Sequence, residues 1–178
     1  GLVANDFPVN PGLPTYCWDI PQHSYDPEKA KFYWDKTGLS SIEVAVSNAG
    51  DAAAVDCSVI LQEQASAAGI DLVVNRVPDD GYWSHTWMQV PFNVSGWNSR
   101  PTADLALTLP HACGGSWNET AWCNERFDEL LVLGRKETDA DKRLEIYCEA
   151  CTLLHDDGGA FIPFFKNYVE GTSLRTQN

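Results

Sequence analysis

The sequence has few basic residues: 12 Lys and Arg stand against 25 Asp and Glu, so the formal net charge is −13. Nucleic-acid binding depends on clustered Lys and Arg side chains that neutralise phosphates, and this composition argues against a nucleic-acid partner. It argues equally against binding to an anionic membrane surface. The charge favours solubility and carries no information about the fold.

Long apolar runs are also missing, since none approaches the roughly 20 residues needed to span a bilayer. A signal peptide is not visible either. The chain opens with Gly1-Leu2-Val3, without a Met and without a basic start. We therefore expect the chain to be a piece of a longer protein.

Motifs for nucleophilic, metalloprotease or phosphate chemistry are absent, because the sequence contains no G-x-S-x-G, HExxH or P-loop. His23, His85 and His111 are isolated along the chain. We expect each to be a surface or loop histidine rather than a catalytic one.

One cysteine and histidine cluster could hold part of a metal site. Cys148, Cys151 and His155 fall at i, i+3 and i+7, on one helical face. A zinc site requires four ligands, and no second CxxC or HxxxH is present. Because Leu144 and Tyr147 lie on the same face, we favour small buried cysteines and predict no metal site.

The remaining cysteines leave a disulfide open. Cys113 and Cys123 flank a Gly-rich loop and could pair in an oxidising compartment, but spacing alone does not fix connectivity. With 44% apolar and 21% charged residues in 178, the chain can bury a core as one domain or two very small ones.

Helices and strands alternate along the chain. Asp26, Pro27 and Gly38 punctuate a helix over 27–37. The other patterns predict, in order, a strand at 42–46, a helix at 51–69, a strand at 70–77, a short aromatic helix through 82–87, a strand at 92–97, helices at 124–137 and 139–159, and a strand at 160–165. Thr138 and Asp141 resemble a capping box for the last helix. This order predicts an α/β fold with a mixed, mostly parallel sheet flanked by helices.

The stretch 92–109, FNVSGWNSRPTADLALTL, ends an apolar strand in Gly96-Trp97, followed by Asn98-Ser99-Arg100 and a proline. Open α/β sheets bind ligands beyond the carboxyl ends of their strands. An indole next to an amide and a guanidinium suits a pocket that stacks and anchors a polar organic ligand. We predict that the residues at the end of this strand recognise a ligand; a purely structural turn is the alternative.

Four segments together resemble family 5 extracellular solute-binding proteins, the peptide, opine and nickel receptors of bacterial ABC importers. The segments are YDPEKAKFYWDKTGL, LQEQASAAGIDLVVNRVPDDGYW, FNVSGWNSRPTADLAL and 124–165, in the order found in that family. The resemblance implies one lobe of a bilobed, periplasmic-binding-protein-like clamp, close to the carboxyl terminus. It implies domains of 1–24 as an extended connector, 25–160 as the ligand-binding lobe, and 161–178 as a strand and tail returning toward a missing lobe.

The resemblance also implies a function. The protein would bind a small organic solute, peptide-like or sugar-like, between its lobes, with no cofactor and no chemistry on the ligand. Its partners would be ABC permease subunits. The protein itself would be periplasmic or extracellular and associated with the cytoplasmic membrane, and a Cys113–Cys123 bridge is more plausible in that location. The implied ligand-binding residues are Ser95, Gly96, Trp97, Asn98 and Arg100, and we add Trp117 because it is a tryptophan in a loop.

The sequence departs from the family at one position. Peptide-binding members place an Asp about three residues after this Trp, where it pairs with the peptide amino terminus, and this chain has Arg100 there. A cation repels an ammonium group, so we expect an anionic or sugar-like ligand, or a peptide held differently. A salt bridge at the surface is the alternative role for Arg100.

Two other functions stay open. The first is a metal-binding or Cys/His-dependent enzyme domain using Cys148, Cys151 and His155. The second is a protein-interaction module in which the Trp-rich loops contact another chain.

Overall fold

A computed structural model describes residues 1–167, 169 and 171–173. The chain divides into two compact units. Unit 1 contains Gly1–Gln22 and Ser99–Asn178, and unit 2 contains His23–Asn98. These units do not coincide with the predicted bounds of 1–24, 25–160 and 161–178.

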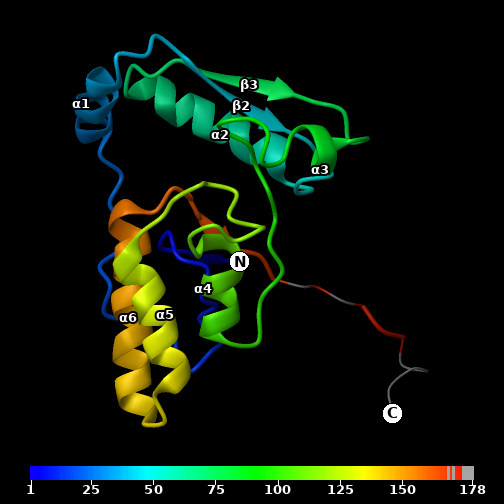
Figure 1. The fold of residues 1–178 in the computed structure, drawn as a ribbon. Helices are drawn as coiled ribbons and strands as arrows, with labels where there is room; N and C mark the ends of the chain where they lie inside the picture. The colour runs from blue at the N-terminus through cyan, green and yellow to red at the C-terminus, as the bar shows by residue number, and fades with distance from the viewer. Residues whose placement is uncertain (168, 170, 174–178) are drawn as a thin grey trace. The chain divides into compact units, whose positions relative to one another are not determined.

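Unit 2 is built on a parallel β-α-β motif (Figure 1). β2 (Ile42–Val46) pairs with β3 (Leu72–Arg76) in the register Ile42↔Leu72, and α2 (Ala54–Ala67) is the crossover between them. The alternating β-branched residues place Val44 and Val46 on one face, where they pack with Leu72 and Ala54 in the core of this unit. The predicted parallel pair and its crossover helix are confirmed.

Two further helices belong to unit 2. α1 (Pro27–Thr37) begins where the Asp26 side chain accepts a hydrogen bond from the Lys29 N–H at 2.9 Å, and it ends at Gly38, whose φ is 70°. These are the predicted signals. α3 (Tyr82–His85) is a single turn within the predicted aromatic helix of 82–87.

The predicted strand at 92–97 is reduced to an isolated parallel bridge between Ala45 and Asn93. The Ala45 N–H donates to the Phe92 carbonyl at 3.0 Å, and the Val94 N–H donates to the Ala45 carbonyl at 3.2 Å. Pairing with β2 stops after Val94, because the next backbone hydrogen bond of the segment is made to the turn after β2 and not to β2 itself.

Three helices form most of unit 1: α4 (Ala103–His111), α5 (Glu125–Lys136) and α6 (Ala140–Asp157). Figure 1 shows α5 and α6 side by side as a helical hairpin. Their apolar faces bury Leu107, Phe127, Leu130, Ala150 and Leu154 in one core. The helices at 124–137 and 139–159 were predicted, with ends that differ by up to two residues.

Two local predictions were wrong in unit 1. No helix was predicted between 97 and 124, although Thr102 caps α4 by accepting a hydrogen bond from the Leu105 N–H at 3.3 Å. Pro110 lies in the last turn of this helix, one residue before its end. The α6 helix is capped by Asp139, which accepts from the Asp141 and Lys142 N–H groups, and not by Thr138.

The amino-terminal segment does not behave as an extended connector. Phe7, Val9 and Cys17 are buried in the unit 1 core. A disulfide joins Cys17 to Cys148 in α6. Residues 1–22 therefore complete this unit, because without them the helices would lack part of their apolar cover.

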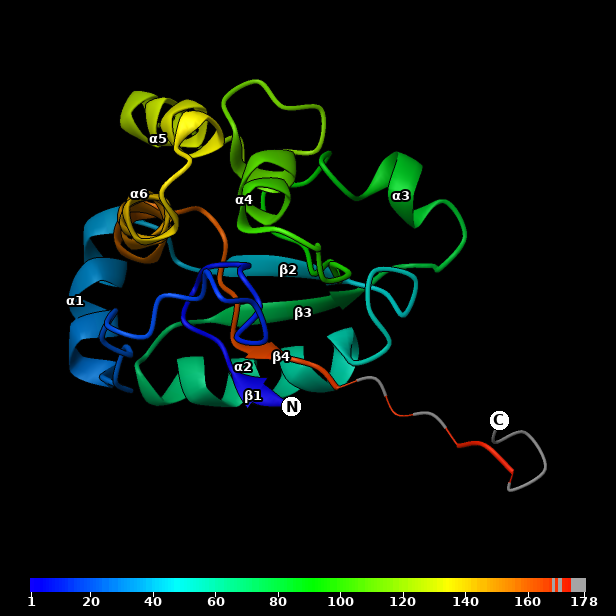
Figure 2. The same cartoon turned by 90° about the horizontal axis from the view of Figure 1, so that it is seen from below.

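A short antiparallel pair closes unit 1. β1 (Leu2–Val3) pairs with β4 (Phe164–Phe165), as Figure 2 shows. Of the predicted last strand at 160–165, only this part after Pro163 is in the sheet, and β1 was not predicted. The α/β class is confirmed, with one parallel and one antiparallel pair among the described residues. No described helix has the length and apolar character needed to cross a bilayer.

Candidate functional site

The predicted ligand-binding residues are divided between the two units. Ser95, Gly96, Trp97 and Asn98 are the last residues of unit 2, whereas Arg100 and Trp117 belong to unit 1. Ser95–Asn98 follow the bridge to β2 without regular secondary structure. The predicted residues therefore form two separate groups, one in each unit.

The part in unit 2 lies beyond the carboxyl end of β2. After Val94 bonds to Ala45, the Gly96 N–H donates to the Gly50 carbonyl at 2.8 Å. The segment thus runs along β2 and then against the turn that follows it. Ligands bind at this edge in open α/β sheets, and the sequence reasoning located Ser95–Asn98 there.

Close packing fixes the backbone of this segment. A Cβ atom at Gly96 would lie 2.5 Å from Asp51 Oδ2 and 3.2 Å from the Gly50 carbonyl oxygen, so a larger residue here would require Asp51 to move. Asp51 is itself held by the Ala53 N–H, which donates to its Oδ1 at 2.8 Å. The start of α2 and the segment therefore hold each other in place.

The Asp79 carboxylate, in the segment after β3, forms a hydrogen bond with Ser47, the residue that follows β2. The Ser47 hydroxyl donates to Asp79 Oδ1 at 2.5 Å and accepts from the Ala49 N–H at 3.1 Å. The hydrogen bond from Ser47 is the main reason that the pKa of Asp79 lies below its ordinary value. Asp79 is thus an ionised group at this edge, and sequence reasoning treated it only as a helix cap.

Aromatic side chains surround the turn of α3. Tyr82 is buried and contacts Trp83 edge-on, with ring centroids 5.4 Å apart. Trp83 contacts Trp87 in the same manner at 5.5 Å. Because Trp83 keeps 49% of its surface exposed, this short helix presents an indole to solvent.

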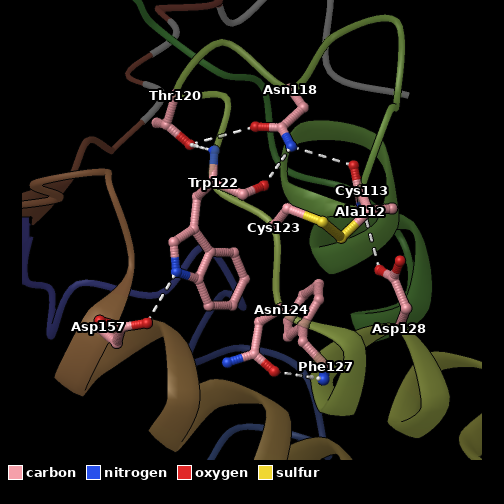
Figure 3. Close-up of a disulfide and its surroundings, with 10 residues drawn as sticks. All are labelled: Ala112, Cys113, Asn118, Thr120, Trp122, Cys123, Asn124, Phe127, Asp128 and Asp157. Carbon is pink, nitrogen blue, oxygen red and sulfur yellow. Dashed lines mark hydrogen bonds between the residues drawn. A yellow bond between two sulfur atoms is a disulfide. The ribbon is translucent and has the colours of Figure 1, made fainter.

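The part in unit 1 is a loop closed by the disulfide between Cys113 and Cys123, drawn in Figure 3. The sequence left this pairing open, and the structure contains it. Trp117 lies within the loop and is 47% exposed. It can therefore contact a ligand or a partner, as an interfacial aromatic side chain does.

Hydrogen bonds make the Cys113–Cys123 loop well defined (Figure 3). Asn118 Nδ2 donates to the carbonyl oxygens of Ala112 and Trp122, at 3.1 and 2.7 Å. The Trp122 indole donates to Asp157 at the end of α6, at 3.1 Å. Trp122 also packs edge-on against Phe127 of α5. The loop is thus anchored to the helices, and Trp122 belongs to its support.

The two cysteines of the Cys148, Cys151 and His155 cluster have structural surroundings. Cys148 is oxidised in the bond to Cys17. Cys151 is fully buried, and burial raises the pKa of its thiol, which disfavours the thiolate needed for metal binding or attack. His155 is buried, with Nδ1 3.2 Å from the Asn5 carbonyl oxygen. The interpretation of the cysteines as structural residues is supported.

The three isolated histidines were expected at surfaces or in loops, and one of them is elsewhere. His85 is exposed at the end of α3, and its ring lies 3.0 Å from Ser84 Oγ. His23 is also exposed. His111 is buried at the end of α4, and burial lowers its pKa from 6.5 to about 4. It therefore stays neutral at neutral pH.

Comparison with known proteins identifies related sequences and folds. No family model matches the chain. The dipeptide-binding protein of Escherichia coli K12 is 26% identical over 174 residues, covering 91% of this chain. The chain spans only 32% of that relative's length.

Solved structures have the same fold over most of the chain. A putative peptide-binding protein, AppA, from Clostridium difficile matches 89% of this chain and 34% of its own, with a TM-score of 0.77 and 19% identity. The periplasmic binding protein DppA from Helicobacter pylori, associated with an ABC transporter and solved with the peptide STSA, matches 86% and 31%, with a TM-score of 0.70 and 20% identity. The predicted resemblance and the fold, that of part of a periplasmic binding protein, are confirmed.

Proposed function

We propose that the protein carrying this chain is the substrate-binding component of an ABC importer, and that it binds a peptide or another small polar organic solute. The main support is Ser95–Asn98, a segment docked beyond the carboxyl end of β2 in a fold shared with peptide-binding proteins. That edge is where open α/β sheets bind ligands. The relatives are binding proteins by name, and the ligand would be released unchanged.

The residues of the proposed site have distinct roles. Trp97 would stack on the ligand, and Ser95 and Asn98 would form hydrogen bonds with it, from a backbone fixed at Gly96. In unit 1, taken by itself, we propose that Arg100 pairs with an anionic group and that Trp117 offers an exposed aromatic contact. A guanidinium favours a ligand with a free carboxylate, such as a peptide carboxyl terminus.

The disulfides support a location outside the cytoplasm. The chain contains two disulfides, Cys17–Cys148 and Cys113–Cys123. Disulfides are rare in reducing compartments. They support the proposal of a periplasmic or extracellular location, and the proposed role implies ABC permease subunits as partners of the full-length protein. The net charge of −13 disfavours a nucleic-acid partner.

Native mass spectrometry of the full-length protein tests this proposal. We expect a bound molecule of low mass at one copy per protein, released on unfolding and carrying a carboxylate. A protein that co-purifies with no small molecule and binds no peptide added afterwards would contradict the proposal.

The exposed tryptophans favour a second candidate, a protein-interaction module. Trp83 and Trp117 remain 49% and 47% exposed, and exposed indoles are enriched in protein interfaces. This candidate predicts self-association or partner binding that persists in the full-length protein. Light scattering of the chain and of the full-length protein separates the two functions, because association limited to the chain alone favours the solute-binding role.

A further inference from the structure

Tyr82 makes a hydrogen bond to the backbone of the candidate site. Its hydroxyl donates to the Val94 carbonyl oxygen at 2.7 Å. The Tyr82 side chain is 1% exposed and Val94 is partly buried, so the bond is partly shielded from water. Val94 directly precedes Ser95, and this bond therefore fixes the peptide unit from which the proposed ligand-binding residues continue.

Gly50 brings the Tyr82 ring and the segment together. A Cβ atom at Gly50 would collide with the Val94 carbonyl and lie 2.8 Å from Tyr82 Cε1. The Gly50 carbonyl in turn accepts the Gly96 N–H at 2.8 Å. Glycine at this position thus lets three chain segments meet: the turn after β2, the start of α3 and residues 94–96.

The backbone on both sides of Ser95 is consequently held by different partners. Tyr82 holds the carbonyl of Val94, and Gly50 holds the amide of Gly96. Two backbone hydrogen bonds this close together keep neighbouring side chains near one geometry, and binding groups must be held to within about 0.5 Å to act together. A loosened backbone would cost affinity through the ordering required on binding.

We propose that Tyr82 is a positioning residue for the solute site: it does not touch the ligand, and it sets affinity by fixing Val94–Gly96 so that Ser95, Trp97 and Asn98 are presented in one arrangement. This inference rests on the proposed function. It extends that function to a side chain on α3, which sequence reasoning assigned only to an aromatic helix.

The test compares Tyr82→Phe with wild type in the full-length protein. The variant removes the hydroxyl and keeps the ring, so the packing against Gly50 is preserved. Tyr147→Phe is the matched control, because Tyr147 is also buried, at 4% exposure, but lies in α6 of unit 1. Two quantities are measured: the Kd for the dipeptide alanyl-alanine by calorimetry, and deuterium exchange of residues 92–98 against β2.

We expect Tyr82→Phe to raise the Kd by about fivefold and to speed exchange in 92–98 by about tenfold, while exchange in β2 stays at the wild-type rate. Tyr147→Phe should leave the Kd and both exchange rates unchanged. If the Tyr82 hydroxyl only stabilised the core of unit 2, the Tyr82→Phe substitution would instead speed exchange in β2 and in 92–98 together.

Two results would overturn the proposal: an unchanged Kd in Tyr82→Phe, or exchange that rises equally in β2. If wild type binds neither alanyl-alanine nor any other peptide and also co-purifies with no small molecule, the proposed function fails. Exchange in 92–98 then still decides whether Tyr82 fixes this segment, so the two failures are distinguishable.

Discussion

Asn118 illustrates what a single residue's surroundings add to a sequence pattern. The triplet Asn118-Glu119-Thr120 fits the glycosylation pattern. In the structure the side chain is buried, and its nitrogen donates to two backbone carbonyls. Thr120 donates to its oxygen at 3.2 Å. The residue is therefore an internal brace of the Cys113–Cys123 loop, because both ends of its amide are already in use.

His111 should make the stability of the chain depend on pH. Burial disfavours the charged ring, so its pKa is about 4 in the folded chain, against the ordinary value of 6.5 that applies once the chain unfolds. Below pH 6.5 the unfolded chain binds a proton that the folded chain refuses, so the free energy of unfolding falls as the pH falls toward 4. The loss amounts to about 3 kcal/mol.

The variant His111→Leu isolates this effect. Urea unfolding between pH 7 and pH 4 should show a weaker dependence on pH than wild type, since the carboxylates titrate equally in both proteins. His85→Leu, which removes an exposed histidine, is the control and should retain the wild-type dependence. Equal pH dependence in His111→Leu and wild type would contradict the assignment.

At the scale of elements, local signals predicted most of the helices and the β2–β3 pair. These signals are local, because the capping residues and the repeating apolar residues of one helix lie close together in sequence. Asp26 and Gly38 at the two ends of α1 are an example. β1 and the burial of 1–22 depend on partners far along the chain, such as Phe165 for Leu2. A two-residue strand has no periodicity of its own, so no local pattern could predict it.

The two disulfides should differ in their effect on stability. Cys17–Cys148 joins residues 131 apart and anchors the amino-terminal segment to α6, whereas Cys113–Cys123 spans 10. Closing a longer loop removes more entropy from the unfolded chain, so a Cys17→Ser, Cys148→Ser variant should lose about 5 kcal/mol. The Cys113→Ser, Cys123→Ser variant should lose about 3 kcal/mol on the same basis.

Urea unfolding without reductant measures both losses. If the variant lacking the short loop proves the less stable of the two, residues 1–22 contribute less to unit 1 than their burial indicates.

At the scale of the whole molecule, sequence reasoning predicted the relationship and the fold better than the site. Four ordered segments carry the relationship, and comparison with known proteins confirms it. The site residues stay a prediction, since Ser95–Asn98 and Arg100 lie in different units. Tyr82 and Gly50 could not be found from sequence, because their role depends on a close approach between segments that lie far apart along the chain.

The central claim is that this chain contributes Trp97 to a solute site, and calorimetric titration of the full-length protein with alanyl-alanine tests it most directly. Wild type should bind saturably at one site, and Trp97→Ala should bind at least about tenfold more weakly, because the indole would supply the stacking surface. Equal affinity in wild type and Trp97→Ala would contradict the account.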